Sequence, residues 1–406
     1  MLLDHPVEPS AIRTQFGAIF VALELSRTKW LVTSLSPGNG EKMSKRCLEA
    51  GDMAGLMCLF FDLKRKAAVR AGKSYPIIVI QEAGLDGFWI HRVLQEQGIE
   101  SHVVDAASIA VPRRKRQAKT DKIDGEKLLR VLLAYKRGEP RVCSMVVPPS
   151  PEEEDARRLY REREVLIAER IAHVNRIKGL LFSQGIGDYE PMLCKRRVRL
   201  EELRTGDGRA LPLRLKAQIS RELDRLELLL EQIKAVETER DGLLAAARQD
   251  GLGGKPHPVA MMFELRGIGP DFATGVWLEG LCRHFDNRRQ VGAYAGLAGT
   301  PWQSGSIARE QGISKAGNPR LRTLMIQLAW LWLRHQPQSA LARWFHAQGL
   351  RGQKKWRKVA IVALARKLLV ALWKYVTHGV VIEGAVMKRA PAKGTASTRA
   401  VMAAAA

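Results

Sequence analysis

The sequence predicts three successive parts: a mixed α/β domain, a long helical arm and a mainly α-helical domain. Strand-like and helix-like stretches alternate as far as about residue 140, a pattern typical of an α/β domain. Long, charged sequence with helical periodicity follows, and a glycine-rich break at 251–256 separates it from the last part. We therefore place domains at 15–145, 151–250 and 258–380, followed by a tail at 381–406 whose small and polar composition predicts disorder.

The first domain is expected to contain strands and helices in alternation. It begins with two runs rich in apolar and β-branched residues, and the polar residues between them suit a hairpin connection. A later run, YPIIVIQ, is almost wholly apolar, as a buried strand would be. The expected elements are strands at 19–25 and 30–34, a helix at 52–71, a strand at 75–81, a helix at 88–97 and a strand at 101–104.

The second part is expected to form two long helices. In the first, apolar residues recur at spacings of three or four: Ile167, Ile171, Val174, Ile177 and Leu181. In the second, a 4-3-4-3 spacing makes a short heptad seam: Ile219, Leu223, Leu226, Leu230 and Ile233. Either the two helices pair within one chain, or the seam joins another subunit as a coiled coil. So short a seam does not decide between these arrangements.

The charge of the chain indicates a polyanionic partner. Lys and Arg number 66 against 42 Asp and Glu, a net charge of +24 over 406 residues. Nucleic acid is the expected partner, because phosphates relieve the self-repulsion of such a chain. No apolar run is long enough to span a bilayer, and the first residues, MLLDHPVEPS, do not resemble a signal peptide. We expect a cytoplasmic bacterial protein associated with the nucleoid.

The cysteines are expected to be reduced, buried and structural. They are odd in number and scattered: Cys47, Cys58, Cys143, Cys194 and Cys282. They show neither a C-x-x-C motif nor the clustering with histidine that a zinc site needs.

Four acidic residues stand where a metal site could be built. Glu24 lies at the end of the first expected strand and Glu82 at the end of the central one. Asp121 and Asp124 are three residues apart, which puts both on one face of a helix. Oxygen ligands of this kind hold Mg²⁺ in phosphodiester chemistry. Alternatively, the aspartates favour the positive end of a helix capped by Thr120, and the glutamates are solvent-exposed edge residues.

Three further features suit contact with nucleic acid backbones. A cationic block lies just before the aspartates: Arg113, Arg114, Lys115, Arg116 and Lys119. The repulsion among the charges of such a block is relieved best by phosphates, although a solvated loop is the alternative. In the third domain, LRGIGP at 265–270 matches a helix-hairpin-helix turn, in which the backbone around Gly267 and Gly269 could hold a phosphate. The third feature is a second basic group, Lys354 and Lys355, before a long apolar helix.

The third domain also contains a serine in a specific setting. The block YAGLAGTPWQSG at 294–305, which contains Ser304, is followed by GISKAGNPRLR at 312–322. These blocks and the GIGP turn resemble the C-terminal domain of the insertion-sequence-110 family of transposases. The N-terminal part, with its QEAG and KTDKID motifs, resembles their DEDD domain, a RuvC-like relative of the ribonuclease H fold. The resemblance extends from about residue 16 to 379, with the blocks in the correct order.

The resemblance implies a reaction and the residues that perform it. Glu82, Asp121 and Asp124 match three of the family's four acidic metal ligands, and Ser304 matches its nucleophile. Glu24 departs from the pattern, because the family has aspartate there and the extra methylene displaces the carboxylate. The family implies a phosphoserine intermediate, a Mg²⁺-binding acidic site and homo-oligomers, dimers or tetramers.

The resemblance also implies the nucleic-acid partners. In the family, a non-coding guide RNA pairs with donor and target DNA, so base pairing selects the sequence. Independently of the resemblance, the cations that follow Ser304 in sequence, Lys315, Arg320 and Arg322, would lower the energy of a pentacoordinate phosphate. The alternative is that they are ordinary solvent-exposed charges.

Two other functions remain open at the level of sequence. In a metal-dependent DNA junction nuclease, Ser304 would only shape a loop, as a serine before glycine usually does. In a catalytically inactive nucleic-acid-binding protein, the glutamate at position 24 would mark a lost site.

Overall fold

The computed structural model describes residues 17–38, 42–84, 87–109, 121–140, 142–249, 256–304, 307–348 and 354–388. Contacts divide the chain into two compact units, which meet in sequence between Ser150 and Pro151. Unit 1 contains a mixed sheet with helices, and unit 2 is mainly helical. An α/β part followed by a helical part is therefore confirmed. Among the described helices, none is both long enough and apolar enough to cross a membrane.

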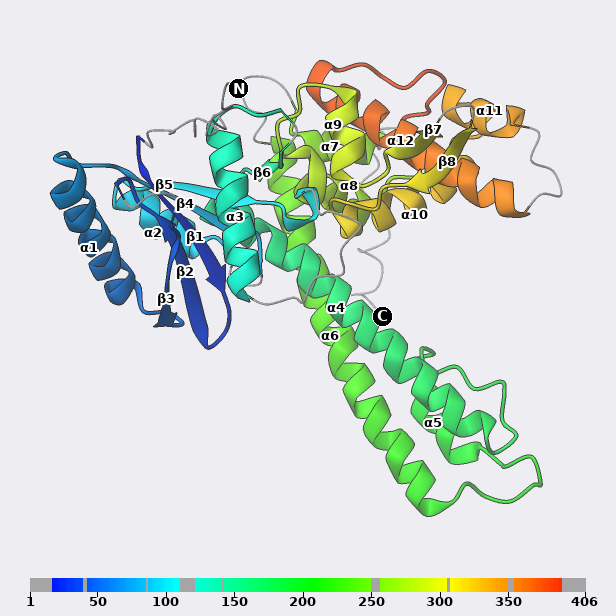
Figure 1. Ribbon diagram of the computed structural model, residues 1–406. Helices are drawn as coiled ribbons and strands as arrows, with labels where there is room; N and C mark the ends of the chain where they lie inside the picture. The colour runs from blue at the N-terminus through cyan, green and yellow to red at the C-terminus, as the bar shows by residue number, and fades with distance from the viewer. Residues whose placement is uncertain are drawn as a thin grey trace, which may run out of the picture. The chain divides into compact units, whose positions relative to one another are not determined.

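Unit 1 is built on a six-stranded sheet with the strand order β3-β2-β1-β4-β5-β6 (Figure 1). β1 pairs antiparallel with β2, and β2 with β3, whereas β4 is parallel to both β1 and β5. The strands are β1 (Ile19–Leu25), β2 (Lys29–Leu35), β3 (Ser44–Glu49), β4 (Ile77–Glu82), β5 (Glu100–Val104) and β6 (Met145–Val146). The helices are α1 (Met53–Ala71), α2 (Trp89–Glu96) and α3 (Asp121–Lys136), with a short 3-10 turn, η1, at Ala106–Ser108.

Each face of this sheet has its own hydrophobic core, because successive side chains of a strand point to opposite faces. On one face, alternate residues of β1 and β4 pack with Phe60 of α1 and Leu94 of α2. On the other face, Phe20 and Ile80 pack with Leu128 of α3 and its neighbours. The sheet is therefore a middle layer, with α1 and α2 on one side and α3 on the other.

Unit 2 begins with two long helices that pair lengthwise (Figure 1). They are α4 (Pro151–Phe182) and α6 (Leu213–Gln249), with the short α5 (Arg196–Glu202) between them in sequence. Ile219 and Leu223 of the heptad seam are buried with Ile177 and Leu181 of α4. The seam is thus filled by a helix of the same chain. Ile171 is 48% exposed, so the apolar stripe expected for α4 does not continue evenly along the helix.

A buried charge lies inside this helix pair. Glu222 is 4% exposed, and its carboxylate accepts hydrogen bonds from His173 at 2.5 Å and Arg176 at 2.9 Å, both on α4. Arg225, one turn further along α6, adds a third. Burial alone would raise the pKa of Glu222, but these hydrogen bonds outweigh it and hold the pKa below its ordinary value. A charged cluster therefore joins the two helices at one position.

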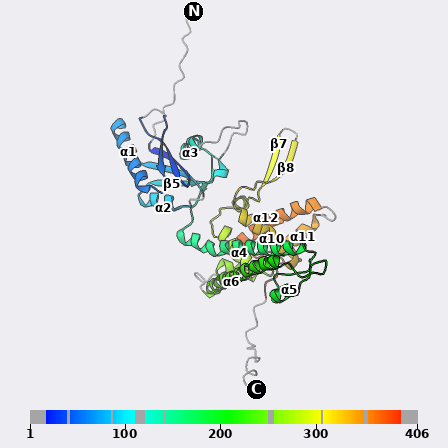
Figure 2. The same cartoon turned by 90° about the horizontal axis from the view of Figure 1, so that it is seen from below.

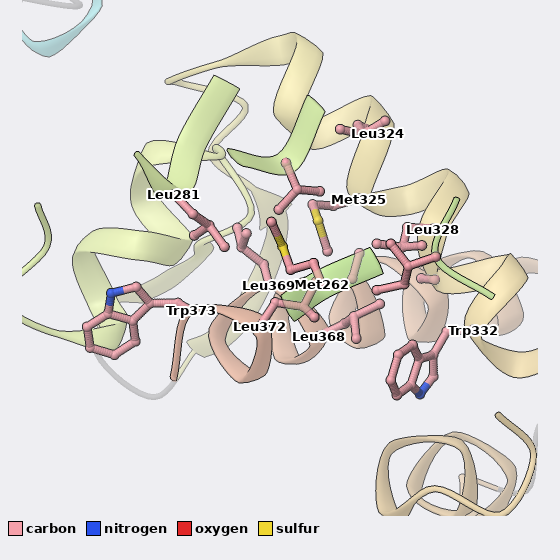
Figure 3. Close-up of a cluster of buried hydrophobic side chains, with 14 of the residues drawn as sticks. Met262, Leu281, Leu324, Met325, Leu328, Trp332, Leu368, Leu369, Leu372 and Trp373 are labelled. Carbon is pink, nitrogen blue, oxygen red and sulfur yellow. The ribbon is translucent and has the colours of Figure 1, made fainter. Parts of the chain in front are cut away.

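The rest of unit 2 is a helical core with one small hairpin. Its elements are α7 (Pro258–Glu264), α8 (Pro270–Val276), a π-helical turn η3 (Trp277–Leu281), α9 (Arg288–Tyr294), β7 (Gly299–Ser304), β8 (Ile307–Ile313), α10 (Pro319–His335), α11 (Ala340–Ala347) and α12 (Lys354–His378). Figure 3 shows the centre of its core, where Met262, Met325, Leu328 and Leu368 are fully buried.

Trp332 has the strongest expected effect on the stability of unit 2. Its side chain is 1% exposed, and its indole N–H donates to Ser339 Oγ at 2.9 Å. Trp332→Ala should lower the free energy of unfolding by about 3–5 kcal/mol, because it leaves a large cavity in the core. Trp330→Ala, on the same helix but 39% exposed, is the matched control and should cost about 1 kcal/mol or less. Denaturant unfolding measures both, and equal losses would contradict this account of the core.

The end of the described chain is packed rather than disordered. Ile382 is 7% exposed, and Met387 forms a β-bridge with Leu265. The Gln336 side chain donates to Val386 O and accepts from Val386 N, which holds this segment against α10. The disorder predicted from residue 381 onward therefore does not apply to 381–388, because buried hydrogen bonds fix these residues. Residues 389–406 lie outside the described residues.

The cysteines are free, as expected, but they are not all buried. Cys47, Cys58 and Cys194 are exposed, and Cys143 and Cys282 are intermediate. The expectation of burial is therefore wrong for these three exposed cysteines, because the spacing of cysteines in a sequence says little about which face of a helix or strand each occupies.

Candidate active site and nucleic-acid interface

Glu24 and Glu82 lie near the carboxyl ends of two neighbouring central strands, β1 and β4, in unit 1. We call this end of the sheet the acidic edge. β1 and β4 are parallel, and their register pairs Leu23 with Gln81, one position before the two glutamates. Because side chains alternate along a strand, both glutamates share the face of the sheet that packs against α3. Both are intermediate in exposure. The pairing of strands therefore brings together two carboxylates that are 58 positions apart, as their residue numbers show.

The first turns of α3 lie over the same edge. α3 begins at Asp121, and Asp124 follows three residues later. A Cβ atom placed on Gly125 would lie 3.6 Å from Glu24 Cγ, so the helix backbone beside Asp124 closely approaches Glu24. Asp124 Oδ1 also lies 3.3 Å from Lys127 Nζ. The side chain of Asp121 lies outside the described residues.

The described carboxylates do not form a complete metal cage. Among the described residues, no group of three or more His, Cys, Asp or Glu side chains is close enough to hold a metal ion. Metal binding by Glu24, Glu82, Asp121 and Asp124 therefore stays a prediction. In donor chemistry and in the position of the strand ends and of α3, these residues fit a divalent cation that prefers oxygen ligands.

Ser304 is the last residue of β7 in unit 2. It pairs with Ile307 at the start of β8, and β7 and β8 together form a separate two-stranded sheet. Figure 2 shows these strands as a hairpin that projects from the helices of unit 2. Residues 305–306 and the Ser304 side chain lie outside the described residues. The serine is thus placed at the end of β7, opposite the start of β8, while its role as a nucleophile stays a prediction.

Two glycines allow the backbone segments at the base of this hairpin to pack closely together. Gly296 and Gly317 have φ values of 63° and 97°, which favour glycine. A Cβ atom on Gly296 would lie 2.2 Å from Ala316 O, and one on Gly317 would lie 2.2 Å from Tyr294 O. The AGL and AGN segments therefore approach each other too closely for any larger residue. This contact gives a physical reason for the glycines in both halves of the serine motif.

A buried ion pair supports the same region. Glu279, in the π-helical turn, is 2% exposed and accepts a hydrogen bond from Arg161 of α4 at 2.8 Å. Its carboxylate and backbone also accept from Asn318, whose own Oδ1 caps α10. Burial raises the pKa of Glu279, but the hydrogen bonds from Arg161 and Asn318 outweigh it and hold the pKa below its ordinary value. The loop between β8 and α10 is therefore anchored to α4.

The basic residues predicted to bind nucleic acid have varied surroundings. Lys315 is exposed and has a φ of 58°, unusual for a residue other than glycine. Arg320 pairs with Glu164 at 3.0 Å, and Arg322 donates to Lys315 O at 2.9 Å, so both already contribute to the fold. Arg113, Arg114, Lys115, Arg116 and Lys119 lie outside the described residues, as do the side chains of Lys354 and Lys355. Their contact with nucleic acid stays a prediction.

Short helices flank the turn at 265–270, with α7 before it and α8 after it. Gly267 has a φ of 90°, and a Cβ atom there would lie 2.6 Å from His335 Cβ. Gly269 is the N-cap residue of α8. Packing against α10 is therefore enough to explain Gly267, and phosphate binding at this turn remains a prediction.

Sequence reasoning missed the residues that support these sites. Glu279 and Arg161 showed no signal, because their pairing joins segments 118 residues apart. Gly125 did show one, since glycine is a poor helix former and yet stands four residues after the start of α3. Thr33, which Gly125 approaches, could be found only from the pairing of strands.

The chain is similar to known proteins over most of its length. The model of the family "Transposase IS116/IS110/IS902 family" matches residues 260–343, which include the turn at 265–270 and both blocks of the serine motif. The chain is 67% identical to "Putative transposase y4rJ" of Sinorhizobium fredii, over 95% of this chain and 98% of that protein. It is 30% identical to "Probable family 20 transposase" of Pseudomonas aeruginosa, over 73% and 83% respectively. It is 26% identical to "Transposase for insertion sequence element IS1328" of Yersinia enterocolitica, over 75% and 85%.

Proposed function

Because the chain belongs to the IS116/IS110/IS902 family of insertion-sequence transposases and its substrate is therefore DNA, we propose that it cuts and rejoins DNA through the hydroxyl of Ser304 with a Mg²⁺-binding acidic site. The observation that carries this proposal is the placement of Glu24, Glu82 and Asp124. Glu24 and Glu82 lie at one edge and on one face of the sheet in unit 1, and the helix α3, which contains Asp124, packs on that face beside Glu24.

The acidic residues are the part of the site that would hold the cation. Glu24, Glu82, Asp121 and Asp124 offer carboxylate oxygens, the ligands that Mg²⁺ prefers. When bound, the cation supplies positive charge to the attacking and leaving oxygens of a phosphodiester. The carboxylates would fix the position of the cation and so determine the side from which the DNA backbone approaches. We also infer that unit 1 has a RuvC-like, ribonuclease H-type fold, and the antiparallel β1–β3 strands beside the parallel β1, β4 and β5 support this inference.

Ser304 performs the covalent step. Its Oγ forms a bond to the phosphorus of a DNA strand, while the bond from that phosphorus to a deoxyribose oxygen breaks. The serine proton passes to solvent, and the departing oxygen gains a proton. The phosphoserine linkage keeps the energy of the broken phosphodiester, so a different DNA end can attack it and complete the exchange. Lys315, Arg320 and Arg322 lower the energy of the pentacoordinate phosphate.

A non-coding guide RNA from the element selects the DNA, and the chain acts as a homo-oligomer, a dimer or a tetramer. The support for a second nucleic acid is the net charge of +24, which is large for a chain of this size. Phosphates of RNA and DNA relieve the repulsion among these cations and release bound counterions. The basic block at 113–119, the turn at 265–270 and the start of α12 are the proposed contact regions.

A reconstituted reaction tests this function. The purified full chain is mixed with DNA carrying the element's ends, a target DNA, Mg²⁺ and RNA transcribed from the element's non-coding flank. We expect joined donor and target strands, detected by sequencing the junctions, only when RNA and Mg²⁺ are both present. The control is an RNA whose pairing segments are scrambled. Equal exchange at the same sites with scrambled RNA would contradict guidance, and exchange in EDTA would contradict the acidic site.

A further inference from the structure

Thr33 presents a buried hydroxyl to the acidic edge of the sheet. It lies in β2, pairs with Ala22 of β1, and is 0% exposed. Within the described part of the chain, Thr33 Oγ1 has no hydrogen-bond partner. Buried hydroxyl groups are nearly always hydrogen-bonded, because burying one without a partner costs free energy. This hydroxyl therefore needs an explanation.

The position of the hydroxyl is set by the close approach of α3. A Cβ atom on Gly125 would lie 2.5 Å from Thr33 Oγ1 and 3.6 Å from Glu24 Cγ, so both side chains border the same point of the helix. Gly125 directly follows Asp124. Beside them, Lys45 of β3, which pairs with Thr33 in the sheet, forms an ion pair with Glu126 of α3.

The surroundings leave few roles for Thr33 other than contact with Glu24. By strand alternation, the side chains that share its face on β1 and β2 include Phe20, Ala22 and Leu35, which offer only apolar atoms. A hydroxyl is not required to fill this space, since valine has the same shape. The glutamate carboxylate is the nearby group that gains from a donor, because its long side chain has several torsions that must be fixed before it can bind a ligand.

We propose that Thr33 is a positioning residue of the acidic site, whose hydroxyl donates a hydrogen bond to the Glu24 carboxylate when that carboxylate binds a divalent cation. This inference rests on the proposed function, because it assumes that Glu24 is a metal ligand. Groups that hydrogen-bond to a metal ligand orient it, and their loss commonly weakens metal binding about 10–100-fold. Thr33 acts through Glu24 and does not itself touch the cation. Gly125 allows the helix to come close enough to exclude water from this contact.

The test compares Thr33→Val with Thr33→Ser in the full chain. Titration calorimetry with Mn²⁺ measures cation binding, and thermal unfolding in EDTA measures stability without a cation. Thr33→Val should weaken Mn²⁺ binding about 10-fold or more, whereas Thr33→Ser, which keeps the donor, should stay within about 3-fold of the wild type. In EDTA the valine variant should melt at the same or a higher temperature, because it removes an unpaired buried hydroxyl.

The outcomes separate this inference from the function on which it rests. If Thr33→Val binds Mn²⁺ like the wild type while Glu24→Gln loses binding, the metal site stands and the role of Thr33 is wrong. If the wild type and Glu24→Gln bind equally weakly, both the metal site and the role of Thr33 are wrong. If Thr33→Val melts at a lower temperature in EDTA, the hydroxyl has a structural partner and the positioning role is overturned.

Discussion

Ser304→Ala is expected to abolish the covalent protein–DNA adduct and to lower strand exchange on the order of 10⁴-fold or more, because the substitution removes the atom that bonds to phosphorus. The hairpin should still form, since alanine keeps the backbone pairing of Ser304 with Ile307. The reaction is stopped without adding protease, so that the protein stays attached to the DNA. The adduct is then detected with end-labelled DNA on a denaturing gel. DNA affinity, measured in parallel, should change little.

The control is Ser306→Ala, which removes a second hydroxyl two positions along the chain in the same motif. It should retain both the adduct and the exchange. DNA cleavage that persists in Ser304→Ala without an adduct would contradict the serine mechanism. That result would favour a metal-dependent nuclease in which Ser304 only shapes the hairpin.

Asp124→Asn is expected to lower Mg²⁺-dependent cleavage about 10²–10³-fold, because an amide keeps the shape of the side chain but loses the charge that holds the cation. Folding should be almost unaffected, since the ion pair of Asp124 with Lys127 at 3.3 Å is partly exposed and contributes little to stability. The rate is measured as a function of Mg²⁺ concentration, and thermal unfolding verifies the fold. The loss should be partly recovered at high Mg²⁺.

Glu96→Gln is the matched charge control for this experiment. Glu96 is an exposed residue at the end of α2, on the other side of the sheet from α3. The Glu96→Gln substitution removes one negative charge from unit 1 without changing the acidic edge, so the cleavage rate of this variant should equal that of the wild type. A wild-type rate for Asp124→Asn at every Mg²⁺ concentration would exclude Asp124 from the metal site.

The strands and helices of unit 1 were largely predictable because burial leaves a periodic signal. The apolar runs at 19–25 and 75–81 correspond closely to β1 and β4, and the hairpin between the first two strands is present. β3 was missed, because its sequence, SKRCLE, is polar and mostly exposed at the sheet edge. The β7–β8 hairpin was missed for a similar reason, since its short strands lack an apolar alternation.

The placement of Glu24 and Glu82 was predictable from the sequence, but the residues that pack beside them were not. Strand ends can be located from sequence, so Glu24 and Glu82 could be expected at a common edge. The approach of Gly125 to Thr33 depends on the register of β1 with β2 and on the packing of α3, neither of which has a local signature. The ion pair of Glu279 with Arg161 likewise depends on the docking of distant helices.

The charged cluster around Glu222 makes the paired helices α4 and α6 a spacer of fixed length. Apolar seams alone tolerate sliding by one heptad, because similar side chains then replace one another. Sliding here would remove Glu222 from His173 and Arg176 and leave a carboxylate buried without its hydrogen-bond donors, which is strongly unfavourable. At about 1.5 Å per residue, the 32 residues of α4 span roughly 50 Å. Whatever the far end of this helix pair touches is therefore held at one distance from the helical core.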